Sequence, residues 1–160
     1  MTVSSNANGQ MQALVFPPLR LLHSGYVTRD MERGIECLIQ MFGESTSIKR
    51  NYDVPITTLS GTALIDYAAV KIGGQSFESI QPGKGADSIY AMSLPDHADV
   101  IGFHHLGSRV DGLEEWDALI TSVTQNDIPL LVHGRTETVD YAYVDLRHII
   151  GHVIEYLHYG

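Results

Sequence analysis

Two histidines and two glutamates occupy matching places in the two halves of this 160-residue chain. His23 opens the segment HSGYVTRDMERGI, and His105 opens the similar segment HLGSRVDGLEEW. Glu78 follows His23 by 55 residues, and Glu155 follows His105 by 50 residues. An internal repeat of this kind predicts two similar supersecondary units, each of which must bury one sheet face against something.

These four residue types form a donor set with a definite chemistry. Two imidazoles and two carboxylates suit a borderline divalent ion, namely Mn, Fe, Co, Ni or Zn, and leave positions for water or substrate oxygens. Imidazoles bind the ion firmly, while carboxylates offset its charge and can accept a proton from the substrate. We therefore expect one metal ion held by His23, Glu78, His105 and Glu155, with Glu78 or Glu155 as the catalytic proton acceptor.

The elements that must position the first pair can be predicted from local patterns. Residues 19–28 are apolar enough for a strand. Asp30 is a typical N-cap, the apolar residues behind it recur at helical spacing as far as Phe42, and Gly43 is a typical helix stop. Three further strands are expected at residues 47–52, 63–72 and 75–81. Gly73 and Gly74 predict a hairpin turn, and residues 82–88 predict a loop.

The second half repeats this order. We expect a strand over residues 103–110, a helix over 112–123, and strands over 130–133, 139–145 and 152–159. Each half therefore has the order β-α-β-β-β, with a histidine in the first strand and a glutamate in the last. Because strand side chains alternate between faces, one residue of each strand can point into a concave sheet. The predicted fold class is α+β, with two βαβββ modules forming a cup-shaped mixed sheet around one metal site.

Composition and charge limit the class of protein. Hydrophobic residues make up 44% of the chain and charged residues 18%, which is typical of a folded domain. We expect a flexible tail at residues 1–18 and a single domain at 19–160, with modules at about 19–97 and 100–160. The net charge of −9 argues against nucleic acid as a partner. The single cysteine, Cys37, and the lack of a signal peptide or a long apolar run favour a cytoplasmic location and no membrane contact.

Four stretches resemble the vicinal oxygen chelate superfamily, which includes glyoxalase I, methylmalonyl-CoA epimerase, extradiol dioxygenases and bleomycin-resistance proteins. They are HSGYVTRDMERGIECLIQMFG, FESIQP, GFHHLGSRV and GHVIEYL. The resemblance implies paired βαβββ modules around a cup, metal ligands at the four positions given above, a small-molecule substrate bound through its oxygens, and a homodimer. It also implies isomerase, epimerase or lyase chemistry through an enolate-type intermediate.

Within the superfamily, FESIQPGKGADSIYAMSL followed by GFHHLGSRV resembles methylmalonyl-CoA epimerases most, although DLRHIIG departs from their pattern. Val27 and Pro82 stand where glyoxalase I has its glutathione-binding Arg and an Asn, which argues against glutathione as cosubstrate. Extradiol dioxygenases use two His and one Glu, so Glu78 argues against that alternative. The remaining alternative is a non-catalytic binding or resistance protein with an apolar, aromatic-lined cleft.

Several other polar residues have less specific signals. His104 is expected outside the cleft, because neighbouring strand residues point to opposite sides. Cys37 is expected on a helix away from the site. Three histidines of the C-terminal region are expected on the surface: His148, His152 and His158. Four further residues fit a position in the cleft and an ordinary strand or loop position equally well: Arg109, Arg147, Tyr141 and Tyr143.

Overall fold

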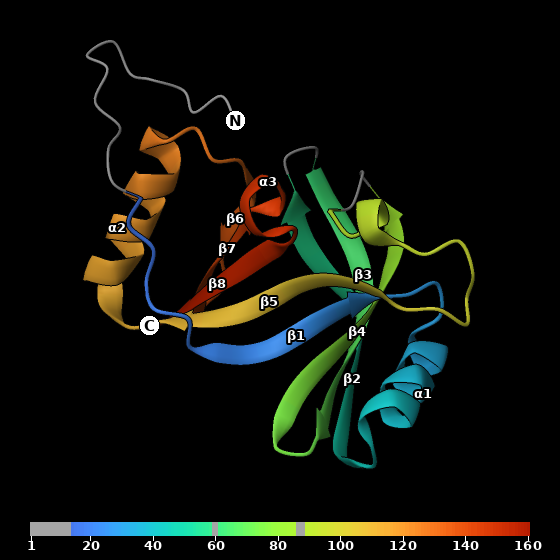
Figure 1. The fold of residues 1–160 in the computed structure, drawn as a ribbon. Helices are drawn as coiled ribbons and strands as arrows, with labels where there is room; N and C mark the ends of the chain where they lie inside the picture. The colour runs from blue at the N-terminus through green and yellow to red at the C-terminus, as the bar shows by residue number, and fades with distance from the viewer. Residues whose placement is uncertain (1–13, 59–60, 86–88) are drawn as a thin grey trace.

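A single mixed sheet organises the part of the chain that the structure describes. The computed structural model describes residues 14–58, 61–85 and 89–160. Within these ranges eight strands form one sheet in the order β2-β3-β4-β1-β5-β8-β7-β6 (Figure 1). The predicted α+β architecture of two βαβββ modules is confirmed.

The first module contains one long helix and the first four strands, followed by a 3-10 turn: β1 (Leu21–Val27), α1 (Met31–Phe42), β2 (Ser45–Thr58), β3 (Gly61–Ile72), β4 (Gln75–Gly85) and η1 (Ala91–Ser93). The second module repeats that order and adds a short helix before its last strand: β5 (Gly102–Val110), α2 (Gly112–Gln125), β6 (Leu130–Arg135), β7 (Val139–Asp145), α3 (Arg147–Ile150) and β8 (Val153–Tyr159).

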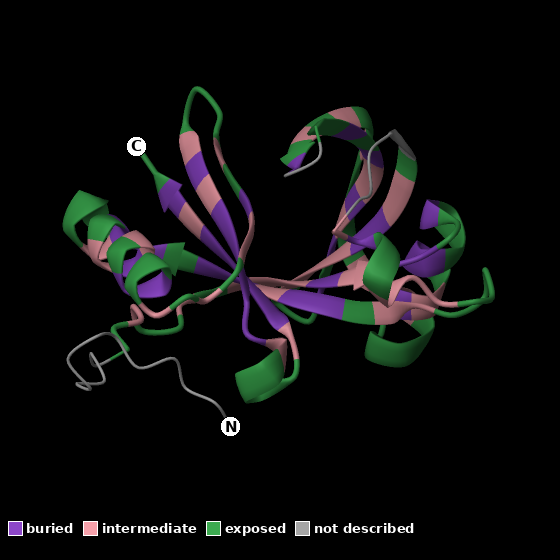
Figure 2. Ribbon diagram, turned by 90° about the horizontal axis from the view of Figure 1, so that it is seen from above, coloured by how far each residue is buried: buried purple, intermediate pink, exposed green. Residues whose placement is uncertain are grey.

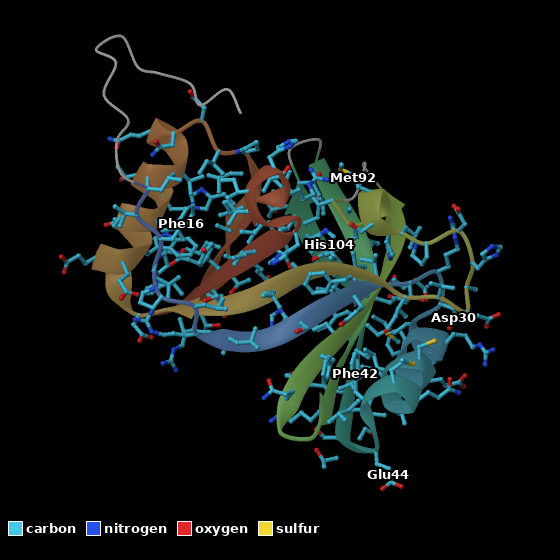
Figure 3. The ribbon with its side chains drawn as sticks, viewed as in Figure 1. Phe16, Asp30, Phe42, Glu44, Met92 and His104 are labelled. Atoms are coloured by element: carbon cyan, nitrogen blue, oxygen red, sulfur yellow. The ribbon has the colours of Figure 1, made fainter. Side chains whose placement is uncertain are left out.

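Helix α1 begins and ends where its capping residues predict. The Asp30 carboxylate accepts hydrogen bonds from the backbone N–H groups of Glu32 and Arg33, and so satisfies donors that the first turn leaves free. Gly43 ends the helix with a φ of 109°, a conformation that favours glycine. Figure 3 shows Asp30 at the start of α1 and Phe42 at its far end.

Two strands are longer than their sequence patterns predict. β2 runs to Thr58 through Pro55, which is tolerated because β2 is an edge strand and a proline there deprives no neighbour of a hydrogen bond. The predicted loop at residues 82–88 is wrong for residues 82–85, because β4 stays paired with β3 as far as Gly85 opposite Ala63. The rest of that predicted loop, residues 86–88, lies outside the described residues.

The two long helices cover the two halves of the sheet. Buried residues of α1 pack against β3, and buried residues of α2 pack against β5, β7 and β8. A third apolar cluster contains Val27, Ile80, Val132 and Tyr143, and so joins strands of both modules. Figure 2 shows buried residues along the central strands and exposed residues on the outer helix faces. None of the described helices combines the length and hydropathy needed to cross a bilayer.

The end of the predicted tail contacts the second module. The Val15 N–H donates to Ser122 Oγ of α2 over 2.9 Å, and the Phe16 ring stacks on Tyr156 of β8. Figure 3 shows Phe16 beside α2. Residues 1–13 lie outside the described residues, so flexibility of that part stays a prediction.

The modules meet along one antiparallel pair of strands. β1 pairs with β5 antiparallel, β4 lies parallel to β1, and β8 lies parallel to β5. The four central strands therefore repeat one arrangement on either side of the β1–β5 pair. At the other end of each module the edge strands β2 and β6 contact each other, so the sheet curls into a cup.

Candidate metal site

The four predicted site residues come together on the four central strands. Each offers one nitrogen or oxygen atom, and these four atoms all lie within 4.8 Å of one another. His23 Nε2 is 2.9 Å from Glu155 Oε2 and 3.5 Å from Glu78 Oε2. His105 Nε2 is 3.5 Å and 3.7 Å from the same two oxygen atoms. The donor set is thus two nitrogen and two carboxylate oxygen atoms, a combination that fits a divalent transition-metal ion.

Strand register explains how residues so distant in sequence meet. In the β1–β5 pair, His23 lies opposite Gly107, and His105 lies opposite Gly25. Glu78 of β4 lies beside Gly25, and Glu155 of β8 lies beside Gly107. Each glycine is therefore surrounded by one histidine and one glutamate from the strands on its two sides.

The two glycines leave the space that the imidazole rings occupy. A Cβ atom built on Gly25 would overlap the His105 ring, and one built on Gly107 would overlap the His23 ring. The two rings meet edge to face, with centroids 5.2 Å apart. The sequence carries this arrangement as HSG and HLG, so the His-x-Gly pattern in both halves is the signal that could have indicated it.

His104 was expected to be exposed or packed outside the cleft, and it is buried, contacts His105 and is not among the residues that line the cavity. His104 has no partner residue in the β1–β5 pairing, because Gly25 lies opposite His105 and the next residue, Tyr26, lies opposite Phe103. Such a bulge redirects a side chain, so simple alternation does not hold here. The His104 and His105 Nδ1 atoms are 2.9 Å apart, and His104 is only 3% exposed.

The contacts of His104 determine which nitrogen of His105 is free. His104 Nε2 lies 3.1 Å from the carbonyl oxygen of Ile89, which can only accept, so this nitrogen carries the hydrogen. Burial lowers the pKa of His104 to about 3, which keeps its ring neutral. His104 Nδ1 then accepts from the Nδ1–H of His105. The lone pair of His105 Nε2 is left facing the two glutamates, the tautomer that a metal ligand needs.

Electrostatics in the cluster push the two glutamates in opposite directions. Burial raises the pKa of Glu78, whereas at Glu155 the hydrogen bond and the positive charge of His23 help to outweigh burial and lower the pKa. Burial lowers the pKa of His23, but the hydrogen bond to Glu155 and the negative charges of both glutamates outweigh this effect and raise it to about 9. The two close carboxylates thus hold positive charge between them.

A cavity of about 330 Å³ opens above three of the four residues. His23, Glu78 and Glu155 line it, and His105 is fully buried beneath them. Apolar side chains of both modules and five tyrosines form its walls: Tyr67, Tyr90, Tyr141, Tyr143 and Tyr159. The Tyr90 and Tyr143 hydroxyls are 2.9 Å apart, and burial together with the charge of Glu155 raises both pKa values well above the usual range, so both phenols stay neutral.

Of the other polar residues considered in the sequence, some line the cavity and some lie elsewhere. Tyr141 and Tyr143 line the cavity, while Arg109 pairs with Asp111 and Arg147 pairs with Asp145. Cys37 lies on α1 with its Sγ near the backbone oxygen of Asp99. Tyr67, Tyr90 and Tyr159 were not predicted as cavity residues, because isolated tyrosines carry no signal of the face they occupy.

The C-terminal histidines do not form a second cluster with one another. His148 is exposed, and His152 contacts the Phe103 ring. The prediction of a surface position is wrong for His158, which is 5% exposed. Its Nδ1 lies 3.3 Å from Asp140, and its ring packs on Trp116.

Comparison with known proteins identifies the fold. The methylmalonyl-CoA epimerase of Mycobacterium tuberculosis matches with a TM-score of 0.58 and 16% identity, over 94% of this chain and 93% of that one. The epimerase of Streptomyces coelicolor in complex with 2-nitronate-propionyl-CoA matches with a TM-score of 0.58 and 16% identity, over 89% of this chain and 98% of that one. This chain has the vicinal oxygen chelate fold.

Sequence comparison adds nothing to that structural likeness. No family model matches the chain, and no curated protein is similar to it in sequence. A hypothetical protein from Bacillus halodurans shares the vicinal oxygen chelate fold, with a TM-score of 0.57 and 19% identity over 90% of this chain and 96% of that one. At such identities the likeness establishes the fold, and function has to be argued from the site.

Proposed function

We propose that this protein is a divalent-metal-dependent isomerase, epimerase or lyase that acts on a small oxygenated substrate through an enolate-type intermediate. The observation that carries the proposal is the set of four donor atoms, all within 4.8 Å of one another, at the floor of a cavity. Two carboxylates this close, one buried and one largely enclosed, are costly unless positive charge balances them.

The residues divide the work as follows. His23, Glu78, His105 and Glu155 hold the ion, which supplies Lewis acidity to a substrate chelated through two oxygens when it is bound. Either Glu78 or Glu155 moves the proton at the carbon next to the substrate carbonyl, because both carboxylates face the cavity. The neutral phenols of Tyr90 and Tyr143 are hydrogen-bonded to each other in the cavity wall, and the apolar walls exclude water from the reacting carbon.

Replacement of Glu155 tests the proposal. We expect Glu155→Gln to abolish turnover and to lower metal content sharply, because the variant loses a negative ligand in contact with His23. Metal content is measured by elemental analysis of protein purified without chelator. Turnover is measured by deuterium incorporation next to the carbonyl of a panel of α-hydroxyketones, thioesters and 2-oxo compounds. Unchanged metal content in the variant would overturn the assignment.

A second candidate function is supported by the walls of the cavity. A binding or resistance protein that sequesters a small molecule without chemistry needs an apolar, aromatic-lined cup, and the five tyrosines and apolar walls provide one. This alternative expects no stoichiometric metal, so the elemental analysis also separates the two functions. An extradiol dioxygenase is less well supported, because Glu78 takes a position that substrate and oxygen need. It predicts oxygen consumption with a catechol.

A homodimer and a cytoplasmic location stay predictions from the sequence. Sedimentation velocity measures the first, and a mass of two chains is the expected result. The epimerase structures are complexes with acyl-CoA ligands in some cases, which makes acyl-CoA thioesters one substrate class for comparison.

A further inference from the structure

The charges that surround the cavity restrict what it can hold. Of the lining residues that the structure describes, only His23, Glu78 and Glu155 are ionisable groups other than tyrosine, and no Lys or Arg side chain is among them. A divalent ion balances both carboxylates, and neutral imidazoles add no charge. The loaded floor is therefore neutral overall and keeps no surplus positive charge for an anionic substrate.

Two arginines of the second module, Arg135 and Arg147, are already paired with carboxylates. Arg135 makes two hydrogen bonds to Asp140, and Arg147 makes a bidentate pair with Asp145. Neither arginine lines the cavity. The whole chain carries a net charge of −9, which disfavours the approach of polyanions.

The size of the cavity and the side chains of its walls also favour a small, apolar ligand. A cavity of about 330 Å³ lies at the small end of the range for ligand pockets, roughly 300–1,000 Å³. Val54, Ile56 and Ile65 of the first module form one part of its wall, and Val132 and Leu157 of the second module form another. Five tyrosines also line the cavity, and flat apolar bodies pack well against such rings.

Resting on the function proposed above, we infer that the cup takes a small, uncharged molecule with two neighbouring oxygens at one end of an apolar, preferably planar, body. The oxygens reach the ion at the floor, and the body fills the space between the walls. An acyl-CoA thioester does not meet this description, because it is large and carries several phosphate charges.

Hydroxamic acids test this inference, because they share one bidentate oxygen head and differ only in the body. Protein loaded with one equivalent of Co²⁺ is titrated with acetohydroxamic, benzohydroxamic and 4-carboxybenzohydroxamic acids and with methylmalonyl-CoA, and the visible spectrum of the cobalt is followed. We expect benzohydroxamic acid to bind about tenfold tighter than the acetyl and the 4-carboxy probes, because apolar burial favours it and a buried unpaired charge opposes the last. Methylmalonyl-CoA is expected to leave the spectrum unchanged.

Adjacent residues of β2 provide a matched pair of variants. Ile56 lines the cavity, whereas its neighbour Thr57 is exposed and does not. Ile56→Lys places a cation in the wall and should improve binding of the 4-carboxy probe about tenfold relative to benzohydroxamic acid. Thr57→Lys adds the same charge outside the cavity and should leave the preference unchanged.

The outcomes separate this inference from the proposed function. Equal binding of the three hydroxamic acids, tighter binding of the 4-carboxy probe, binding of methylmalonyl-CoA, or no binding of any probe overturns the substrate class, even where Co²⁺ is bound. Failure of the protein to bind one equivalent of Co²⁺ overturns the proposed function itself. The comparison of probes on the unaltered protein stands even if Ile56→Lys does not fold.

Discussion

His23 links metal binding to pH. Its pKa is raised to about 9, so in the metal-free protein at neutral pH its ring carries a proton that bound metal must displace. We expect about one proton released per ion at pH 7, and an affinity that rises about tenfold per pH unit until it levels off near pH 9. Calorimetry in buffers of different ionisation enthalpy measures the released protons. Binding without proton release would contradict the raised pKa.

The same shift affects the stability of the metal-free protein. Because the folded pKa of His23 lies above the unfolded value, its ion pair stabilises the fold fully below pH 6.5, and that contribution is lost as the pH rises through about 9. The free energy of unfolding of the metal-free chain should fall over this interval. Bound metal removes the proton from His23 and with it this source of pH dependence.

In the proposed metal site His104 is a positioning residue, since it reaches the ligand set only through its contact with His105. We expect His104→Phe to weaken metal binding about ten- to a hundredfold, the usual effect of losing the partner that orients a metal-binding imidazole. His104→Gln should restore most of the affinity, because an amide can accept from His105 and donate to Ile89. Competition with a chelator measures affinity, and circular dichroism checks folding. Equal affinities of the Phe and Gln variants would show that the hydrogen bonds do not matter.

Among the strands, Gly25 and Gly107 are expected to be intolerant of any side chain. Gly25→Ala and Gly107→Ala each place a Cβ where an imidazole ring lies. Each variant should reduce metal affinity by at least about tenfold, because a ligand displaced by about an ångström no longer meets the ion. Ser24→Ala, between His23 and Gly25, is the matched control and should bind metal normally. Normal binding by both glycine variants would show that the rings can move at little cost.

Local signals in the sequence predicted the elements well where those signals are physical constraints on the backbone. Asp30 and Gly43 determine both ends of α1, and the Gly73–Gly74 turn, with φ values of 56° and 80°, forms as expected. The length of β2 has no such signal, because its polar edge-strand sequence is held by pairing with β3. The contact between His104 and His105 has no such signal either, since the bulge at His104 depends on the facing strand.

The site was predictable for a different reason. Each half of the chain carries the same pair of residue types at the same place in the same order of elements, so the repeat itself located His23, Glu78, His105 and Glu155. The cavity walls were not predictable, because they come from strands at both edges of the sheet, and the contact between β2 and β6 has no counterpart in either half alone.

At the scale of the whole molecule, each module supplies one histidine and one glutamate to the proposed metal site. We expect a metal ion at about 100 times its dissociation constant to add about 2.7 kcal/mol to the free energy of unfolding. The only tryptophan, Trp116, lies in the second module. Its fluorescence and the far-ultraviolet circular dichroism of the whole chain should therefore follow one coincident transition in the presence of metal. Separate transitions would show that the modules unfold independently.

The pairing of His23 with Gly107 and of His105 with Gly25 has a consequence for the history of the chain. Each module supplies the same half of the donor set: a strand with His-x-Gly and a neighbouring strand that carries a glutamate. Neither module alone supplies four donors. Two copies of a single module joined through their first strands would present the same four atoms. The site therefore does not depend on the order of the two halves along the polypeptide. An ancestral metal centre of this geometry needs no more than one gene encoding one module.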